Sequence, residues 1–109
     1  MSNFLRIIYI TTSSKDEAKR IGKKLVSNKL AACVNIIENM ESMYLWNNEM
    51  VTDSESIIMA KTHQDKVKKL TDTVMELHSY DCPCIISLSI NEQEGNESYL
   101  RWLKETLID

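Results

Sequence analysis

The sequence predicts one α+β domain over residues 1–109, a ferredoxin-like split βαβ sandwich in which an antiparallel sheet carries two helices on one face. Three observations predict it. The chain has 109 residues, of which 43% are apolar, enough for one hydrophobic core. Its local patterns run strand, helix, strand, strand, helix, strand, and then a short terminal helix. Right-handed crossovers in that order place both main helices on the same face of the sheet.

The first strand and the first helix have the clearest patterns. Residues Leu5–Thr12 read LRIIYITT, a run of β-branched and aromatic residues typical of a buried strand. Ser14 and Glu17 have the spacing of a capping box, in which a hydroxyl and a carboxylate each accept a free backbone N–H at a helix start. The apolar stripe that follows at helical spacing consists of Ala18, Ile21, Gly22 and Leu25. The helix is expected to end near Asn28.

The middle of the chain predicts an extended β-hairpin. Two successive strands are expected at residues 30–37 and 42–46, and a return strand at 50–61. Asn47 and Asn48 stand at the turn, and asparagine tolerates the positive φ that tight hairpin turns require. The sequence therefore predicts that the last two of these strands pair directly.

A second helix, a fourth strand and a short helix complete the pattern. Residues 62–65 form a weaker capping pattern, and apolar residues repeat at helical spacing up to His78. Pro83 disfavours helix in the residue before it, and alternating residues then predict a half-buried strand over 86–90. A short amphipathic helix is expected over 99–107.

This arrangement leaves the second face of the sheet without helices. The strands are apolar enough that this face would expose a large apolar patch in a monomer. Patches of more than a few hundred Å² usually mark association sites. The pattern alone therefore predicts self-association.

Composition and motifs exclude several classes of protein. The 13 basic and 16 acidic residues are scattered along the chain, without the basic face of a nucleic-acid binder. No targeting segment and no apolar stretch of about 18 residues is visible, so we expect a cytoplasmic protein that does not span a membrane. With only two glycines there is no phosphate-binding loop, and no catalytic triad or metalloprotease motif has a convincing context. We expect a protein that is not an enzyme.

The cysteines indicate a possible metal site. Their odd number argues against a disulfide framework, and Cys82-Pro83-Cys84 lacks the C-x-x-C spacing of zinc ribbons. The densest group of potential ligands comprises His78, Tyr80, Asp81, Cys82 and Cys84, and Cys33 lies in an earlier strand. Thiolate and imidazole suit Cu(I) or Zn(II). Alternatively, His78 is favoured by the helix dipole at a helix C-terminus, and the cysteines are small packing residues.

Two further groups of residues are candidates for a ligand site or an interface. Glu55 and Lys61 are charges in a mostly apolar strand, where a charge is costly unless it is paired or faces solvent. They either pair across an interface or bind a small ligand. Tyr44 and Trp46 could stack on a ligand, although aromatics in strands more often fill a core or an interface.

Three segments together resemble the CutA divalent-cation tolerance family. They are Leu30–Ile37, Ser42–Trp46 with Glu55–Thr62, and His78–Pro83, and Tyr99–Trp102 resembles the closing helix of that family. The resemblance implies a ferredoxin-like subunit in a tight homotrimer, with sheet faces and long hairpins shared between neighbours. It also implies tolerance of divalent cations such as copper, an architecture similar to PII signalling proteins, and a position for Cys33 near the subunit boundary that the His78 segment approaches.

The sequence departs from the family pattern at several positions. Ser79 stands in place of a proline and Cys84 in place of a glutamate. Glu38 replaces another proline, two asparagines replace a glycine-containing turn, and Thr11 replaces a cysteine that some relatives carry. The fold is expected to tolerate these changes. A site that depends on a carboxylate at position 84 is not expected.

Three functions follow from these observations. The first is a homotrimeric, copper-type cation-binding and tolerance protein that uses Cys33, His78 and Cys82 or Cys84. The second is a PII-like trimeric regulator that binds a small anionic ligand between subunits, with Lys61 as the counter-charge. The third is a scaffold that anchors a protein partner, with packed and unreactive cysteines.

Overall fold

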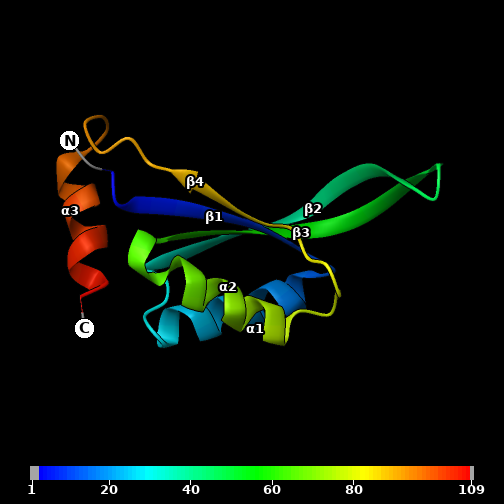
Figure 1. The fold of residues 1–109 in the computed structure, drawn as a ribbon, viewed down its shortest axis with the longest axis horizontal. Coiled ribbons are helices and arrows are strands. Elements are labelled where there is room, and N and C mark those ends of the chain that lie inside the picture. The colour runs from blue at the N-terminus through cyan, green and yellow to red at the C-terminus, as the bar shows by residue number, and fades with distance from the viewer. Residues whose placement is uncertain (1–2, 109) are drawn as a thin grey trace.

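Four strands form one antiparallel sheet in the computed structural model, which describes residues 3–108 (Figure 1). The elements in chain order are β1 (Leu5–Thr12), α1 (Lys15–Ser27), β2 (Cys33–Trp46), β3 (Glu49–His63), a 3₁₀ turn (Gln64–Lys66), α2 (Val67–Leu77), β4 (Ile85–Ser89) and α3 (Glu97–Thr106). The strand order is β2-β3-β1-β4. Both α1 and α2 lie on one face of the sheet (Figure 1). This is the predicted ferredoxin-like arrangement.

The main core lies between the sheet and these two helices. Alternate residues of the central strands, such as Ile8, Ile10 and Ile58, are fully buried in it. Leu25 of α1 and Leu70 of α2 close the same cluster from the helix side. Each such side chain contributes about 1.5–3 kcal/mol through burial.

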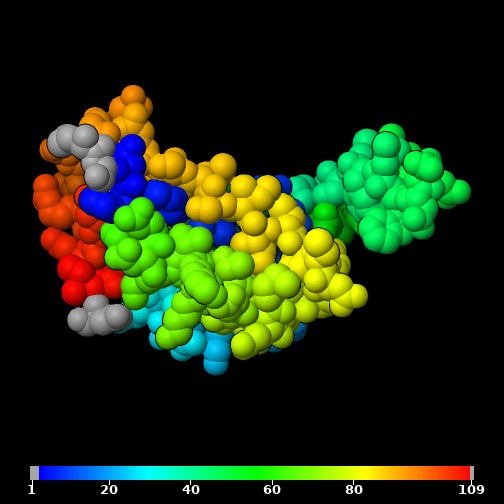
Figure 2. All heavy atoms as spheres, viewed as in Figure 1, coloured from blue at the N-terminus to red at the C-terminus, as the bar shows by residue number. Residues whose placement is uncertain are grey.

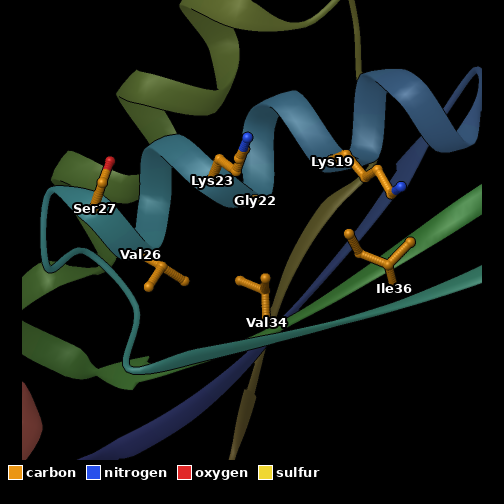
Figure 3. A pocket seen from close by; sticks show the side chains of 7 residues that line it. All are labelled: Lys19, Gly22, Lys23, Val26, Ser27, Val34 and Ile36. Carbon is orange, nitrogen blue, oxygen red and sulfur yellow. The ribbon is translucent and has the colours of Figure 1, made fainter.

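Gly22 permits α1 to approach the edge strand β2 closely. A Cβ at this position would lie only 3.1 Å from Cγ2 of Val34. Beside this contact, α1 and β2 enclose an open hollow of about 520 Å³, floored by Val34 and Ile36 and flanked by Lys19 and Lys23 (Figure 3). Its floor is apolar, and its lining among the described residues includes no thiol or carboxylate.

The C-terminal helix α3 covers one end of the sheet. Leu103 and Leu107 pack with Leu5 in a second buried cluster. The carboxylate of Glu92 connects β1 to α3, because it accepts the backbone N–H of Leu5 at 3.0 Å and pairs with Lys104. The short helix predicted from the sequence is therefore docked on the body of the protein.

The β2-β3 hairpin is longer and more continuous than the sequence predicts. β2 is one strand, whereas two strands separated near residues 38–41 are expected from the pattern. The cause is a β-bulge, since the pairing with β3 shifts between Ile37 and Met40 and Asn39 adopts a φ of 61°. The predicted turn is confirmed, because Asn47 and Asn48 both have positive φ. The resulting arm projects well beyond the body of the molecule (Figures 1 and 2).

The predicted cap of the second helix is wrong. Thr62 is fully buried at the end of β3, and its hydroxyl donates to the carbonyl of Leu30 at 2.6 Å. The ring of His63 instead accepts the N–H of Asp65 at 3.2 Å, which begins the 3₁₀ turn. The α-helix itself starts only at Val67.

The face of the sheet opposite α1 and α2 carries an apolar patch. In the register of the sheet, Leu88 lies opposite Ile7, and Ile86 lies opposite Tyr9, which pairs in turn with Met59. Ile86 is 50% exposed and Leu88 is 47% exposed. These five residues define the open sheet face. Its existence agrees with the bare face that the strand and helix order predicts.

The starts of β4 and β2 differ slightly from those predicted from the sequence. β4 begins at Ile85 rather than Ile86 because Ile85 pairs with Ile10 of β1. The early residues of the predicted strand 30–37 precede β2, which starts at Cys33. Among the described residues, no helix is long and apolar enough to cross a membrane.

Candidate functional site

A cleft of about 620 Å³ lies between the β2-β3 arm and the loop before β4. The arm supplies Tyr44, Trp46, Asp53 and Glu55. The loop supplies Tyr80, Asp81, Cys82 and Cys84. We call this the thiol cleft. It brings together most of the residues that the sequence singles out as candidates.

The β-bulge sets which arm residues face the cleft. Beyond the bulge, Met40 pairs with Glu55 and Ser42 pairs with Asp53, which places both carboxylates on the same side as Tyr44. A shift of one residue would turn this whole set to the opposite face. Asp53 is not among the site residues predicted from the sequence, although its spacing of two from Glu55 in a strand is a usable signal.

Two tyrosines hydrogen-bond to the arm carboxylates. The hydroxyl of Tyr80 donates to Oε2 of Glu55 at 2.9 Å, and the hydroxyl of Tyr44 donates to Asp53. Burial and the bond to Glu55 raise the pKa of Tyr80, and the bond to Asp53 raises the pKa of Tyr44. Both phenols therefore remain neutral donors at physiological pH.

The thiol cleft carries negative charge and no compensating cation. Asp53, Glu55 and Asp81 all line it, and none of the described lining residues is lysine, arginine or histidine. Two thiols share the cleft with these carboxylates, and Cys82 is exposed whereas Cys84 is half-buried. Thiolates bind soft and borderline cations, whereas carboxylates bind hard and borderline cations. The site is therefore suited to a cation and opposes an anion.

Glu17 holds the loop of the cleft in place from α1. Its carboxylate accepts the N–H of Ser13 at 2.9 Å and the N–H of Ser79 at 2.8 Å, and Arg20 lies 3.8 Å away. Burial raises the pKa of Glu17, but the backbone and side-chain hydrogen bonds from Ser13 and Ser79 outweigh that effect and lower the pKa to about 2. The hydroxyl of Ser14 caps the helix as predicted, whereas the carboxylate reaches Ser13 instead of Ser14.

His78 uses both ring nitrogens inside the protein. Nδ1 accepts the N–H of Tyr80 at 3.0 Å, so Nε2 carries the proton and donates to the carbonyl of Thr11 at 2.8 Å. The ring is 9% exposed and lies 4.8 Å from the Tyr80 ring. It would have to give up the bond to Tyr80 before it could bind a metal.

Cys33 and Lys61 lie elsewhere in the subunit. They pair with each other on the sheet, whereas Thr11, next to His78, pairs with Ile57. On β3, Lys61 and Ile57 are therefore separated by about 13 Å, at about 3.3 Å per residue. Lys61 donates to the hydroxyl of Tyr99 at 3.1 Å. One subunit therefore does not bring Cys33 to His78, and the described residues contain no ready group of three metal ligands.

Comparisons with known proteins agree with this architecture. The family described as CutA1 divalent ion tolerance protein matches residues 6–106. The divalent-cation tolerance protein CutA of Thermus thermophilus is 42% identical over 99 residues, which is 91% of this chain and 94% of that protein. The rice chloroplastic protein CutA 1 is 40% identical over 92% of this chain. This chain spans about half the length of the rice and Arabidopsis relatives.

Solved structures give the same result. The crystal structure of CutA1 from Oryza sativa has a TM-score of 0.90 and 38% identity, covering 96% of this chain and 94% of that chain. Both the fold and the sequence match over nearly the whole length. The chain therefore belongs to the CutA1 divalent ion tolerance family.

Proposed function

We propose that this protein is a homotrimer that binds copper or another divalent cation and so contributes to cation tolerance. The observation that carries the proposal is the donor set of the thiol cleft. Three carboxylates and two thiols line it, and no cationic side chain is among its described lining residues. The name of the Thermus thermophilus relative, a divalent-cation tolerance protein, is consistent with such a site.

The open sheet face supports self-association. Ile86, Leu88 and their neighbours would remain in contact with water in a monomer, at a cost of about 25 cal/mol for each Å² of apolar surface. The arm adds Leu45 and Met50, which are 70% and 68% exposed. A symmetric oligomer that covers the face and the arm removes both costs.

The proposed action is binding rather than catalysis. A cation held by carboxylates and thiolates is removed from solution, which lowers its free concentration without any covalent step. The three cysteines are free thiols, and this favours a reducing compartment such as the cytoplasm. The names of the rice and Arabidopsis relatives place those proteins in the chloroplast.

One observation favours the second candidate, a PII-like regulator. The ammonium of Lys61 lies 5.2 Å from the centre of the Tyr99 ring, which stacks on Trp102. A cation beside two partly exposed aromatic rings could hold an anionic ligand with a flat ring. Tyr99 and Trp102 belong to α3, so this patch lies at the far end of the sheet from the thiol cleft.

Native mass spectrometry tests the proposal. The reduced protein is measured before and after addition of Cu(I) or Zn(II). A trimer that takes up stoichiometric metal supports cation binding. A trimer that stays metal-free refutes it and favours a regulator or a scaffold, and a monomer refutes the role of the open sheet face.

A further inference from the structure

We propose that Cys82 and Cys84 form a thiolate pair that binds one soft or borderline divalent cation of the Zn²⁺ or Cd²⁺ type. In this assignment neither Cys33 nor His78 is a ligand. The inference rests on the proposed cation-binding function and names the residues and the class of cation.

The Cys-Pro-Cys segment is built to present two thiols to the same space. Pro83 fixes its own φ and favours an extended conformation in Cys82 before it. In extended backbone, side chains two residues apart point to the same side. In the structure residues 79–82 form a bend, and both cysteines line the thiol cleft; neither is in a disulfide.

Both ends of the loop are anchored to the body. The N–H of Ser79 binds the Glu17 carboxylate, and the carbonyl of Cys84 accepts the N–H of Thr11 at 3.3 Å. Ligands held on an anchored backbone lose less conformational freedom when they bind a metal. The thiol pair is therefore more preorganised than two cysteines on a free loop.

The other predicted ligands are already committed. The single lone pair of the neutral His78 ring accepts the N–H of Tyr80. Cys33 is too distant, because its row of the sheet lies about 13 Å from that of Thr11, at about 3.3 Å per residue. No group of three ligands is preformed in the described residues. The remaining coordination positions are therefore left for water or for the nearby Asp81 carboxylate.

Charge selects a divalent cation over a monovalent one. Binding displaces the protons of the two thiols. A divalent cation and two thiolates then form a neutral unit, whereas Cu(I) and two thiolates leave a net negative charge beside Asp53, Glu55 and Asp81. Hard cations such as Mg²⁺ prefer oxygen ligands and do not compete for the thiolates.

Titration of the reduced full-length chain with Cd²⁺ tests the inference. Cadmium bound to thiolate gives a charge-transfer absorption in the ultraviolet, and competition with a chelator gives the affinity. Loss of an outer-shell group alone lowers metal affinity by about 10- to 100-fold. We therefore expect Cys82→Ser/Cys84→Ser to lose the absorption and at least that much affinity.

The matched control is Cys33→Ser, which removes one thiol at the other end of the sheet. It should keep both the absorption and the affinity, and excess Mg²⁺ should leave the titration unchanged. Circular dichroism and native mass confirm that each variant is folded. Binding that persists in the double variant overturns the inference but not the proposed function, as does loss of binding in Cys33→Ser. Absence of binding in the wild-type chain overturns both.

Discussion

The carboxylate of Glu17 provides a direct test of how the cleft is held together. A carboxyl group whose pKa is lower in the folded chain stabilises the fold above its unfolded pKa, and this stabilisation is lost as the pH falls through the folded value. For Glu17 the two values are 4.5 and about 2. The difference corresponds to about 3 kcal/mol, at about 1.4 kcal/mol for each pKa unit.

We therefore expect Glu17→Gln to lower the free energy of unfolding by about 3 kcal/mol at pH 7. The difference between variant and wild type should shrink as the pH falls from 4.5 to 2, because the wild-type carboxylate then becomes protonated. Denaturant unfolding at several pH values measures it. Both proteins must be compared at one protein concentration, since unfolding of an oligomer depends on concentration.

The control is Glu76→Gln, which makes the same change at an exposed position of α2. It should leave the stability unchanged within about 0.5 kcal/mol. If Glu17→Gln and wild type instead show parallel pH profiles between pH 4.5 and 2, the hydrogen-bonded carboxylate is not the source of the stabilisation and the reasoning fails.

Three other substitutions test separate parts of the structure. Ser79→Pro removes the N–H that binds Glu17 and should destabilise the fold by about 1–3 kcal/mol, whereas Ser79→Ala keeps that N–H, removes only the hydroxyl and should cost less; equal unfolding curves for the two would contradict the assignment. Ile86→Asp places a charge on the open sheet face and should lower the native mass from that of the proposed trimer to that of a monomer, while Ser87→Asp, on the other side of the same strand, should not. Leu103→Ala should cost about 2–5 kcal/mol in thermal or denaturant unfolding if α3 is docked through its buried cluster, and a cost near zero would show that it is not.

The fold is predictable from the sequence because hydrophobic periodicity reports directly on burial. The alternation in β1 and the helical stripe of α1 both follow from residues that touch one core. The β-bulge at residues 38–39 is different. Its cause is a local backbone conformation at Asn39, and the polar run around it has the composition of a loop. The sequence pattern therefore predicts two strands where β2 is one.

The site is predictable only in part, because its residues come from distant segments. Tyr80, Cys82 and Cys84 are close in sequence and line the same cleft. Their apposition to Asp53 and Glu55 depends on the length of the hairpin arm and on the bulge register. Within one subunit Cys33 lies far from His78. Their predicted proximity would arise at a boundary between subunits, so it stays a prediction.

Two departures from the family pattern occur in the same loop and change it in complementary ways. A proline at position 79 has no N–H to offer, so serine at this position allows the bond to Glu17 that anchors the start of the loop. A glutamate at position 84 would add a hard oxygen ligand to the thiol cleft, whereas Cys84 adds a second thiol. A cleft that is more firmly held and richer in sulfur favours cations that bind thiolate in a fixed arrangement. The two substitutions together thus predict a preference for Zn²⁺ and Cd²⁺ over Mg²⁺ in this chain, and the double variant Ser79→Pro/Cys84→Glu should reverse it.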